Sequence, residues 1–224
     1  MVNLILRGFT MLIEIIFILR LAKLRPEWLY GFIVVNLLLI TTLGGKLVDF
    51  LGFTTNVGNI FYASIYLATY MLIEYNGASA AYRGMWIGAS AVFLFILLAQ
   101  LATSMTAAPE ARELDNAIHT VFQESLRISM ASIFAFVMAQ SVNIWLYQTL
   151  RKKTKTAFFW MRVAVSSIVA QAVDSVLFFF IAFAEVIPLK SLATALLAGY
   201  ALKVLFSLFA IPFLYSRLPK VGKA

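Results

Sequence analysis

The chain has 224 residues, of which 62% are apolar and 12% are charged, and its mean hydropathy is +0.92. This composition excludes a water-soluble globular protein, and since one crossing needs about 20 apolar residues, the length allows about six or seven crossings without a sizeable extramembrane domain. The absence of cysteine and the presence of a single histidine, His119, exclude disulfides, thiol catalysis and histidine metal clusters, so no metal site and no cofactor is predicted.

Apolar windows between charged interruptions predict seven helices in a single membrane domain, residues 1–224. The predicted helices cover residues 3–19, 28–43, 58–75, 84–106, 124–147, 158–184 and 191–216. The first is short and contains Arg7 and Glu14, so it either crosses the membrane or lies along its interface. The predicted fold class is therefore an all-α, polytopic integral membrane bundle of six core helices, with this N-terminal helix as a seventh.

Basic residues gather in alternate connections between the predicted helices. One side holds eleven of them: Arg20, Lys23, Arg25, Arg83, Arg151, Lys152, Lys153, Lys155, Arg217, Lys220 and Lys223. The other side holds Lys46, Arg112 and Lys190 among a larger number of acidic residues. The positive-inside rule therefore places the first side, and with it the C-terminus, in the cytoplasm. This topology explains the net charge of +8 without nucleic acid as a partner.

Two connections have features of their own. The longest, about residues 107–123, is expected to be an extracytoplasmic loop with some local structure. Residues 46–57 lie between Gly44 and Gly58. Because glycine frees the backbone from the usual steric limits, a re-entrant turn is an alternative here to a plain surface connection.

Ionisable side chains at membrane depth are the first candidates for a functional site, since each costs about 2.5 to 3.5 kcal/mol on insertion scales and needs a partner or a wet cavity. Asp174 lies near the middle of the sixth predicted helix, with no neutralising residue within one turn. Lys203, near the middle of the last helix, is its expected partner. The two either form an ion pair that only fixes helix register, or face a polar cavity and contact a solute.

Two further ionisable residues lie near the ends of predicted helices. Glu74 is near the cytoplasmic end of the third helix, beside Tyr75 and Asn76, where a caged structural role and a functional role are both open. Arg127 begins the fifth helix on the outer side and has Glu124 one turn away as a local partner.

Polar residues near Asp174 share one helix face. Ser167, Gln171 and Asp174 follow one another at i, i+4 and i+7. Gln140 and Asn143 repeat the three-residue offset of Gln171 and Asp174, 31 residues earlier in the chain. This match indicates either an internal repeat, as transporters have, or polar residues that join helices together.

Aromatic residues on the third predicted helix form another candidate surface. Phe61, Tyr62, Tyr66 and Tyr70 include a face that could stack on a planar ring. The sequence has no phosphate-binding glycine loop, paired-histidine helix or nucleophile elbow, and an intramembrane aspartyl protease would need a second deep aspartate besides Asp174. We therefore expect a protein that is not an enzyme and has no catalytic residue.

Two stretches carry a resemblance to a known family: residues 58–69, GNIFYASIYLAT, and residues 171–178, QAVDSVLF, the latter followed by Ile181-Ala182-Phe183. Both resemble the bacterial queuosine precursor transporter family, also called the vitamin uptake transporter family. The similarity continues, in the family's order and spacing, at residues 46–52, 127–132, 140–143 and 202–203. It covers nearly the whole chain from about residue 30.

The resemblance implies a multi-pass carrier of the bacterial inner membrane that imports 7-deazaguanine bases, either queuosine precursors or queuine, for tRNA modification. Its partners would be this small 7-deazapurine solute and the lipid bilayer. The chain departs from the family at two positions, since Tyr70 and Asn143 stand where the family usually has aspartate. The loss of two carboxylates implies either a preference for a different deazapurine or transport that is not coupled to protons.

The chemistry of a guanine-like ring suggests a role for each candidate. Its N1–H and exocyclic amine are adjacent donors that a carboxylate such as Asp174 can accept together. Amide side chains suit the carbonyl and pyrrole sides, and Phe61 or Tyr66 could stack on the ring. The candidate substrate-binding residues are Asp174, Gln171, Gln140, Asn143, Phe61, Tyr66, Tyr70, Lys203, Glu74 and Arg127.

Two other functions remain open from the sequence. The chain could be a substrate-binding membrane subunit that works only with a separate ATP-driven module, because it has no nucleotide site of its own. It could also be a membrane scaffold that transports nothing, in which Asp174 and Lys203 are simply paired. The sequence does not determine the oligomeric state.

Overall fold

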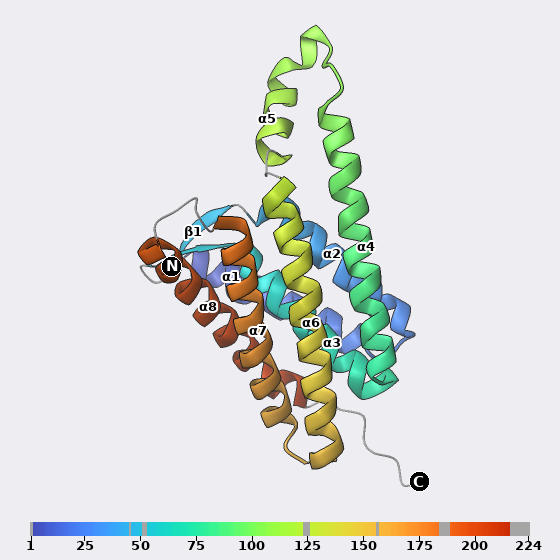
Figure 1. Ribbon diagram of the computed structural model, residues 1–224. Coiled ribbons are helices and arrows are strands. Elements are labelled where there is room, and N and C mark those ends of the chain that lie inside the picture. The colour runs from blue at the N-terminus through green and yellow to red at the C-terminus, as the bar shows by residue number, and fades with distance from the viewer. Residues whose placement is uncertain are drawn as a thin grey trace.

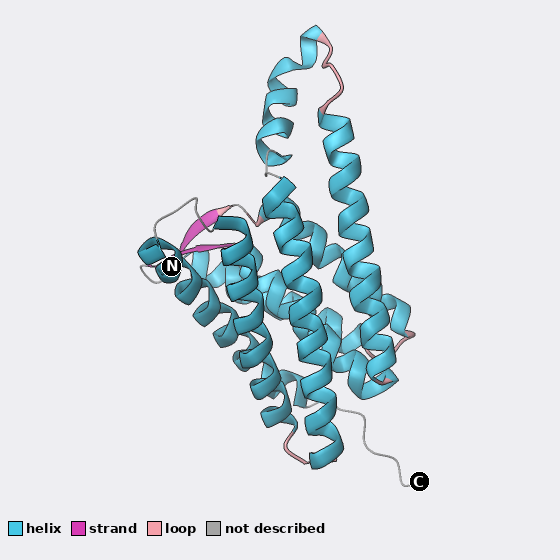
Figure 2. Cartoon of the chain, viewed as in Figure 1, coloured by secondary structure: helices cyan, strands magenta, loops and turns pink. Residues whose placement is uncertain are grey.

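The computed structural model describes residues 2–44, 46–50, 53–122, 126–155, 157–183 and 189–215. These residues form long helices and one short hairpin (Figures 1 and 2). The elements are α1 (Val2–Leu21), α2 (Pro26–Leu43), β1 (Leu47–Phe50), β2 (Phe53–Asn56), α3 (Gly58–Asn76), α4 (Ala78–Thr103), η1 (Pro109–Ala111), α5 (Arg112–Phe122), α6 (Leu126–Thr154), α7 (Phe159–Phe183) and α8 (Leu189–Tyr215). The predicted polytopic helix bundle is confirmed.

The helices are arranged as a ring around one central helix, α3. In the ring, α1 packs on α2, α2 on α4, α4 on α6, α6 on α7, α7 on α8, and α8 on α1. The central helix packs on α1, α2, α4, α6 and α8, and it reaches α7 through side-chain hydrogen bonds. Every other long helix therefore has one face toward α3 and one face outward.

The central position of α3 agrees with its composition. From Gly58 to Ile73, every residue of α3 apart from Tyr62 is buried. Among the described helices, α1, α2, α4, α6 and α7 are long and apolar enough to span a membrane, and residues 199–215 of α8 form a shorter apolar helix, whereas α3 does not meet this standard. Because the ring covers α3, its polar side chains face protein instead of hydrocarbon.

The first helix belongs to the ring. Arg7, Met11, Glu14, Ile15 and Ile18 form its buried face, and large apolar side chains on the rest of its surface are exposed. A helix on the membrane interface would face water with its polar side, but Arg7 and Glu14 lie on the face that packs in the bundle, and the exposed Arg20 is in the last turn of α1. This arrangement favours the spanning alternative for α1.

The connections expected to be loops contain regular structure. Strands β1 and β2 pair antiparallel, with Leu47 opposite Asn56 and Phe50 opposite Phe53, so the described part of this segment is regular (Figure 2). The longest connection contains η1 and α5, and α4 and α5 project together beyond the other helices (Figure 1). The described part of this connection thus has the expected local structure.

Glycines let α4 approach α2 closely. A Cβ atom at Gly88 would lie 2.8 Å from Leu37 Cδ1 and 3.1 Å from Ile33 Cγ2, both on α2. A Cβ at Gly84 would lie 3.0 Å from Tyr30 Cδ1. Small residues at such contacts are typical of membrane helices, which associate through close packing.

We predict that Gly88→Val destabilises the bundle, because the added side chain must displace Leu37 and Ile33 in a packed interface. Overpacking of this kind typically costs about 1 to 3 kcal/mol. The midpoint of thermal unfolding of the purified protein in detergent checks this. Gly8→Val is the matched control, since nothing lies within 4 Å of a Cβ placed there. Equal midpoints for the two variants would contradict the packing account.

Candidate solute-binding site

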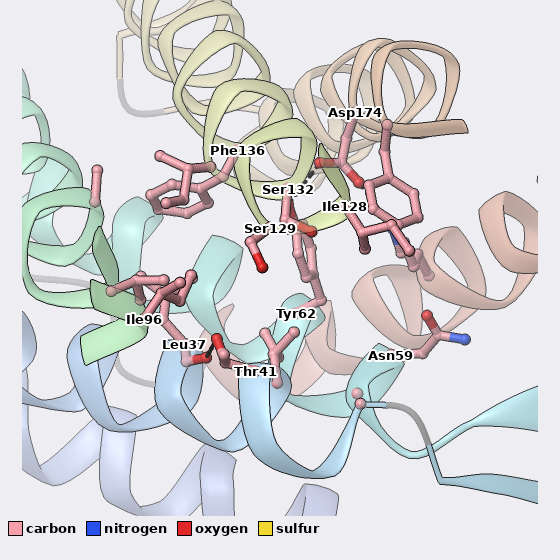
Figure 3. A pocket seen from close by; sticks show the side chains of 18 residues that line it. Leu37, Thr41, Asn59, Tyr62, Ile96, Ile128, Ser129, Ser132, Phe136 and Asp174 are labelled. Atoms are coloured by element: carbon pink, nitrogen blue, oxygen red, sulfur yellow. Dashed lines mark hydrogen bonds and ion pairs between the residues drawn. The ribbon is translucent and has the colours of Figure 1, made fainter. Parts of the chain in front are cut away.

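A cavity of about 180 Å³ lies inside the ring, beside the N-terminal end of α3 (Figure 3). All of the long helices except α1 contribute to its wall. The lining residues are Leu37, Ile40, Thr41, Gly44, Gly58, Asn59, Tyr62, Ala89, Val92, Ile96, Ile128, Ser129, Ser132, Ile133, Phe136, Asp174, Phe178 and Lys203. The cavity thus has mainly apolar walls with a few polar groups, which is the usual composition of a small-molecule site.

Three side chains from three helices form the charged part of the wall. Tyr62 Oη donates a hydrogen bond of 2.5 Å to Asp174 Oδ1, and Lys203 Nζ lies 2.8 Å from Asp174 Oδ2. The same ammonium group lies 4.4 Å from the centre of the Tyr62 ring. Each carboxylate oxygen therefore has one donor, and each keeps a further lone pair for a donor in the cavity.

The Asp174–Lys203 pair has a structural feature of each alternative drawn from the sequence. Asp174 is 2% exposed and is neutralised by Lys203, as a register-fixing ion pair would be. Both residues also line the cavity, together with Tyr62. Of the ten predicted site residues, Asp174 and Lys203 are the two that the structure places in the cavity wall.

The predicted amide residues form a buried layer on α6 and α7 and do not line the cavity. Gln171 Nε2 donates to Ser207 Oγ at 2.7 Å, and Asn143 Nδ2 donates to Gln140 Oε1 at 3.2 Å. Tyr66, Gln140 and Gln171 are fully buried, and Tyr66 Oη, Gln140 Nε2 and Gln171 Oε1 have no hydrogen-bond partner within the described part of the chain. Unpaired buried polar groups are costly, so this layer has unused hydrogen-bonding capacity.

The next layer joins the two positions where the resemblance predicts aspartate. Tyr70 Oη donates to Asn143 Oδ1 at 2.9 Å and lies 2.7 Å from Ser167 Oγ. Ser166 Oγ also donates to Tyr70 Oη at 3.3 Å. The two positions at which the resemblance implies a departure from the family pattern are therefore in direct contact, as a neutral hydrogen-bonded pair.

A charged cluster fills the bundle at the C-terminal end of α3. Glu74 Oε1 accepts a hydrogen bond of 2.8 Å from Tyr147 Oη and lies 3.2 Å from Arg162 Nη2 and 3.3 Å from Arg151 Nε. Arg151 also donates to the carbonyl oxygens of Ile73 and Glu74, at 2.9 and 3.3 Å. Glu74 thus belongs to a structural cage, away from the cavity.

Arg162 is the most buried cation of this cluster. It is 1% exposed, and its Nη1 donates to the carbonyl oxygens of Lys155 and Ala157, at 2.6 and 3.2 Å. These bonds tie the start of α7 to the turn that follows α6, while the bond to Glu74 ties it to α3. The cluster therefore closes the bundle at this end by joining three helices.

Two predicted site residues lie elsewhere. Arg127 Nε donates to the carbonyl oxygen of Ile181 at 2.7 Å, which joins the start of α6 to the end of α7. Its expected partner Glu124 is outside the described residues. Phe61 is buried and does not line the cavity, whereas its neighbour Tyr62 does.

Sequence reasoning did not single out Arg162, Tyr147 or Ser207, and it considered Tyr62 only as part of an aromatic face. Arg162 had a usable signal, because it lies inside the predicted helix 158–184 and an ionisable residue at that depth needs a partner. Tyr62 had another, since it lies one turn before Tyr66 on the same face of α3. The sequence around Tyr147 and Ser207 has no pattern that would have identified them as partners of Glu74 and Gln171.

The apolar outer surface and the polar interior define a multi-pass membrane protein, and a cavity within the ring is where a transporter of this kind would bind its solute. The model of the family described as "Putative vitamin uptake transporter" matches residues 56–216, and the chain belongs to this family. The matched range includes the Asp174–Lys203 pair and both deeper layers. The resemblance found in the sequence is confirmed.

A curated protein that is similar to this chain is also named as a transporter. The "Probable queuosine precursor transporter" of Bacillus subtilis (strain 168) is 26% identical over 173 residues, which cover 76% of this chain and 75% of the relative. No solved structure matches the chain.

We predict strong energetic coupling between Asp174 and Lys203. Lys203→Met alone leaves a buried carboxylate without its cation, which typically costs about 3 to 5 kcal/mol. Asp174→Asn together with Lys203→Met removes both charges and should recover most of the loss. The thermal midpoints of the wild type, the two single variants and the double variant form a double-mutant cycle. Additive effects of the two substitutions would show that the pair is not coupled.

Proposed function

We propose that this protein imports 7-deazaguanine bases, queuosine precursors or queuine, across the bacterial inner membrane for use in tRNA modification. Family membership and the similarity to the probable queuosine precursor transporter of Bacillus subtilis support this solute class. The observation that carries the proposal is the cavity wall in which a carboxylate and an ammonium group lie side by side.

The wall is complementary to one edge of such a base. A guanine-like ring presents its carbonyl, its N1–H and its exocyclic amine in a row, so that one acceptor lies beside two donors. Asp174 can accept from the two donors while Lys203 or Tyr62 donates to the carbonyl. Ser129 and Ser132 line the same cavity, and their hydroxyl groups could bond to the pyrrole side of the ring, where 7-deazaguanine bases differ in their substituent.

The size and lining of the cavity also suit a small bicyclic solute. Its volume of about 180 Å³ is several times the roughly 30 Å³ that one water occupies in the liquid. The ring of Phe136 and the side chains of Leu37 and Ile96 provide apolar walls beside the polar groups (Figure 3). A flat apolar ring with one polar edge matches this division.

We infer that the cavity faces the outside of the cell. It lies at the N-terminal end of α3, whereas Arg83 and residues 151–155 lie at the opposite end, which the positive-inside rule places in the cytoplasm along with the C-terminus. The layers around Tyr66 and Tyr70 and the Glu74 cluster separate the cavity from that end. The arrangement is that of a carrier open to the outside, and import requires these layers to part in a second state.

The two other functions carry different expectations. A scaffold has no use for a cavity beside its ion pair, and a subunit of an ATP-driven complex would bind the solute but not move it alone. Transport by the purified chain in liposomes therefore separates the proposed carrier from both.

We predict that a 7-deazaguanine base stabilises the purified protein against heat and that Asp174→Asn abolishes this effect. A ligand at 100 times its dissociation constant adds about 2.7 kcal/mol to the stability of the state that binds it. Losing the carboxylate strands donors of the ring and should weaken binding about tenfold or more. Thermal midpoints across a panel of purines and deazapurines measure this.

Two controls make the result specific. Glu113→Gln changes an exposed carboxylate on α5 and should leave stabilisation intact. The double variant Asp174→Asn, Lys203→Met tests binding without an unpaired lysine. If Asp174→Asn responds to the base as the wild type does, Asp174 does not bind it, and if no purine or deazapurine stabilises the wild type, the proposed solute class is wrong.

A further inference from the structure

A second buried carboxylate lies on the other side of α3 from the solute cavity. Glu14 is 9% exposed and lies on the inward face of α1, beside the buried Met11 and Ile15. The polar side chains that face its carboxyl group are Asn36 on α2 and Ser64 on α3, which are 1% and 2% exposed. Three helices therefore meet at one carboxyl group with neutral partners.

No described cation neutralises Glu14. The ion pairs among the described residues involve Asp115, Glu74 and Asp174, and none includes Glu14. On its own helix, the nearest charged residue of the buried face is Arg7, two turns earlier. A charged carboxylate in this position would face neutral groups at membrane depth, which is costly.

The elements packed against α1 are α2, α3, α8 and β1, and their described side chains include no unpaired cation for Glu14; the charged residue of α2 is the exposed carboxylate Glu27. On α2 the facing polar group is Asn36, and on α3 it is Ser64. The α3 carboxylate of Glu74 is held by its two arginines, and Lys203 of α8 is bound to Asp174. The side chain of Asp49 in β1 is outside the described set.

The hydrogen-bond inventory of this group is short of one hydrogen atom. Glu14 Oε2 and Asn36 Oδ1 are both buried and have no partner within the described residues. Both atoms are acceptors as long as the carboxyl group is ionised. A proton on the carboxyl group turns one of the two into a donor, and an acid and an amide can then form two antiparallel hydrogen bonds. Glu14, Asn36 and Ser64 are too few to bind a hard metal cation, which needs about six or more oxygen ligands.

We propose that Glu14 is a proton-binding site that couples solute import to proton entry, an inference that rests on the proposed transport function. In the state seen here the carboxyl group holds the proton. In the step itself, the Glu14 carboxylate takes one proton from the outside to form the O–H bond and releases it to the cytoplasm after the bundle has rearranged. Neither Glu14 nor Asn36 lies in the range that the family model matches.

The central helix provides the connection between the proton and the solute. Ser64 of α3 contacts Glu14, while Tyr62, two residues earlier, bonds to Asp174 in the cavity wall. A change of charge at Glu14 alters the packing of α1 on α3, and the same helix carries the solute-binding tyrosine. By linkage, a solute that prefers one position of α3 then changes the proton affinity by the same factor.

Two assays on purified protein in liposomes test the proposal with a labelled 7-deazaguanine base. One measures exchange of the base at equal pH on both sides, and the other measures its accumulation with the interior alkaline. The wild type should do both, and a protonophore should abolish accumulation. Glu14→Gln should exchange the base within about twofold of the wild type but fail to accumulate it. Glu27→Gln, an exposed carboxylate at the start of α2, should match the wild type in both.

The outcomes separate the two proposals. Accumulation by Glu14→Gln, or wild-type accumulation that needs sodium and ignores the pH gradient, overturns the proton site and leaves the transport function standing. Absence of exchange by the wild type overturns the transport function itself. Infrared spectra give a readout that does not depend on transport: a protonated carboxyl band in the wild type should be missing from Glu14→Gln, and an unchanged band overturns the assignment.

Discussion

The structure depends on one constraint: polar groups at membrane depth must be covered by protein. The central helix is too polar to face lipid, and six helices close around it so that it does not. The ring gains an apolar outer surface, and its inner surface carries the partners that α3 requires. Fold and function therefore have the same cause, because the polar groups that need covering are those that a solute can use.

Polar side chains on α3 follow one another at single turns, and each meets a different layer of the ring. Tyr62 meets the charged pair at the cavity, the hydroxyl group of the buried Tyr66 has no partner among the described residues, Tyr70 bonds to Asn143, and Glu74 meets two arginines. The strength of these contacts differs along the helix. The buried hydroxyl group without a partner, that of Tyr66, is one turn from the cavity-lining Tyr62, whereas the ion pairs of Glu74 close the bundle at the opposite end of α3. This order suits a solute that enters from the cavity side.

The sequence predicted the features that hydropathy and electrostatic cost control. It predicted the helices, and the cost of a lone Asp174 led to Lys203 across the bundle. It did not predict the register between helices, which depends on packing of the whole ring. A shift of one residue turns a side chain by about 100° around a helix, so Tyr62 lines the cavity where Phe61 was expected. The sequence left a caged structural role open for Glu74 but did not predict its partners, because Arg151 and Arg162 lie far away in the chain.

The most direct test of the central claim is the accessibility of the cavity from each side of the membrane. The chain has no cysteine, so Ser132→Cys places one thiol in the cavity wall, and Ser166→Cys places one in the buried layer near Tyr70. In sealed right-side-out vesicles, an impermeant thiol reagent should modify the first variant but not the second, and a 7-deazaguanine base should slow the reaction. Modification of Ser132→Cys only from the cytoplasmic side, or at a rate that the base does not change, would contradict the account.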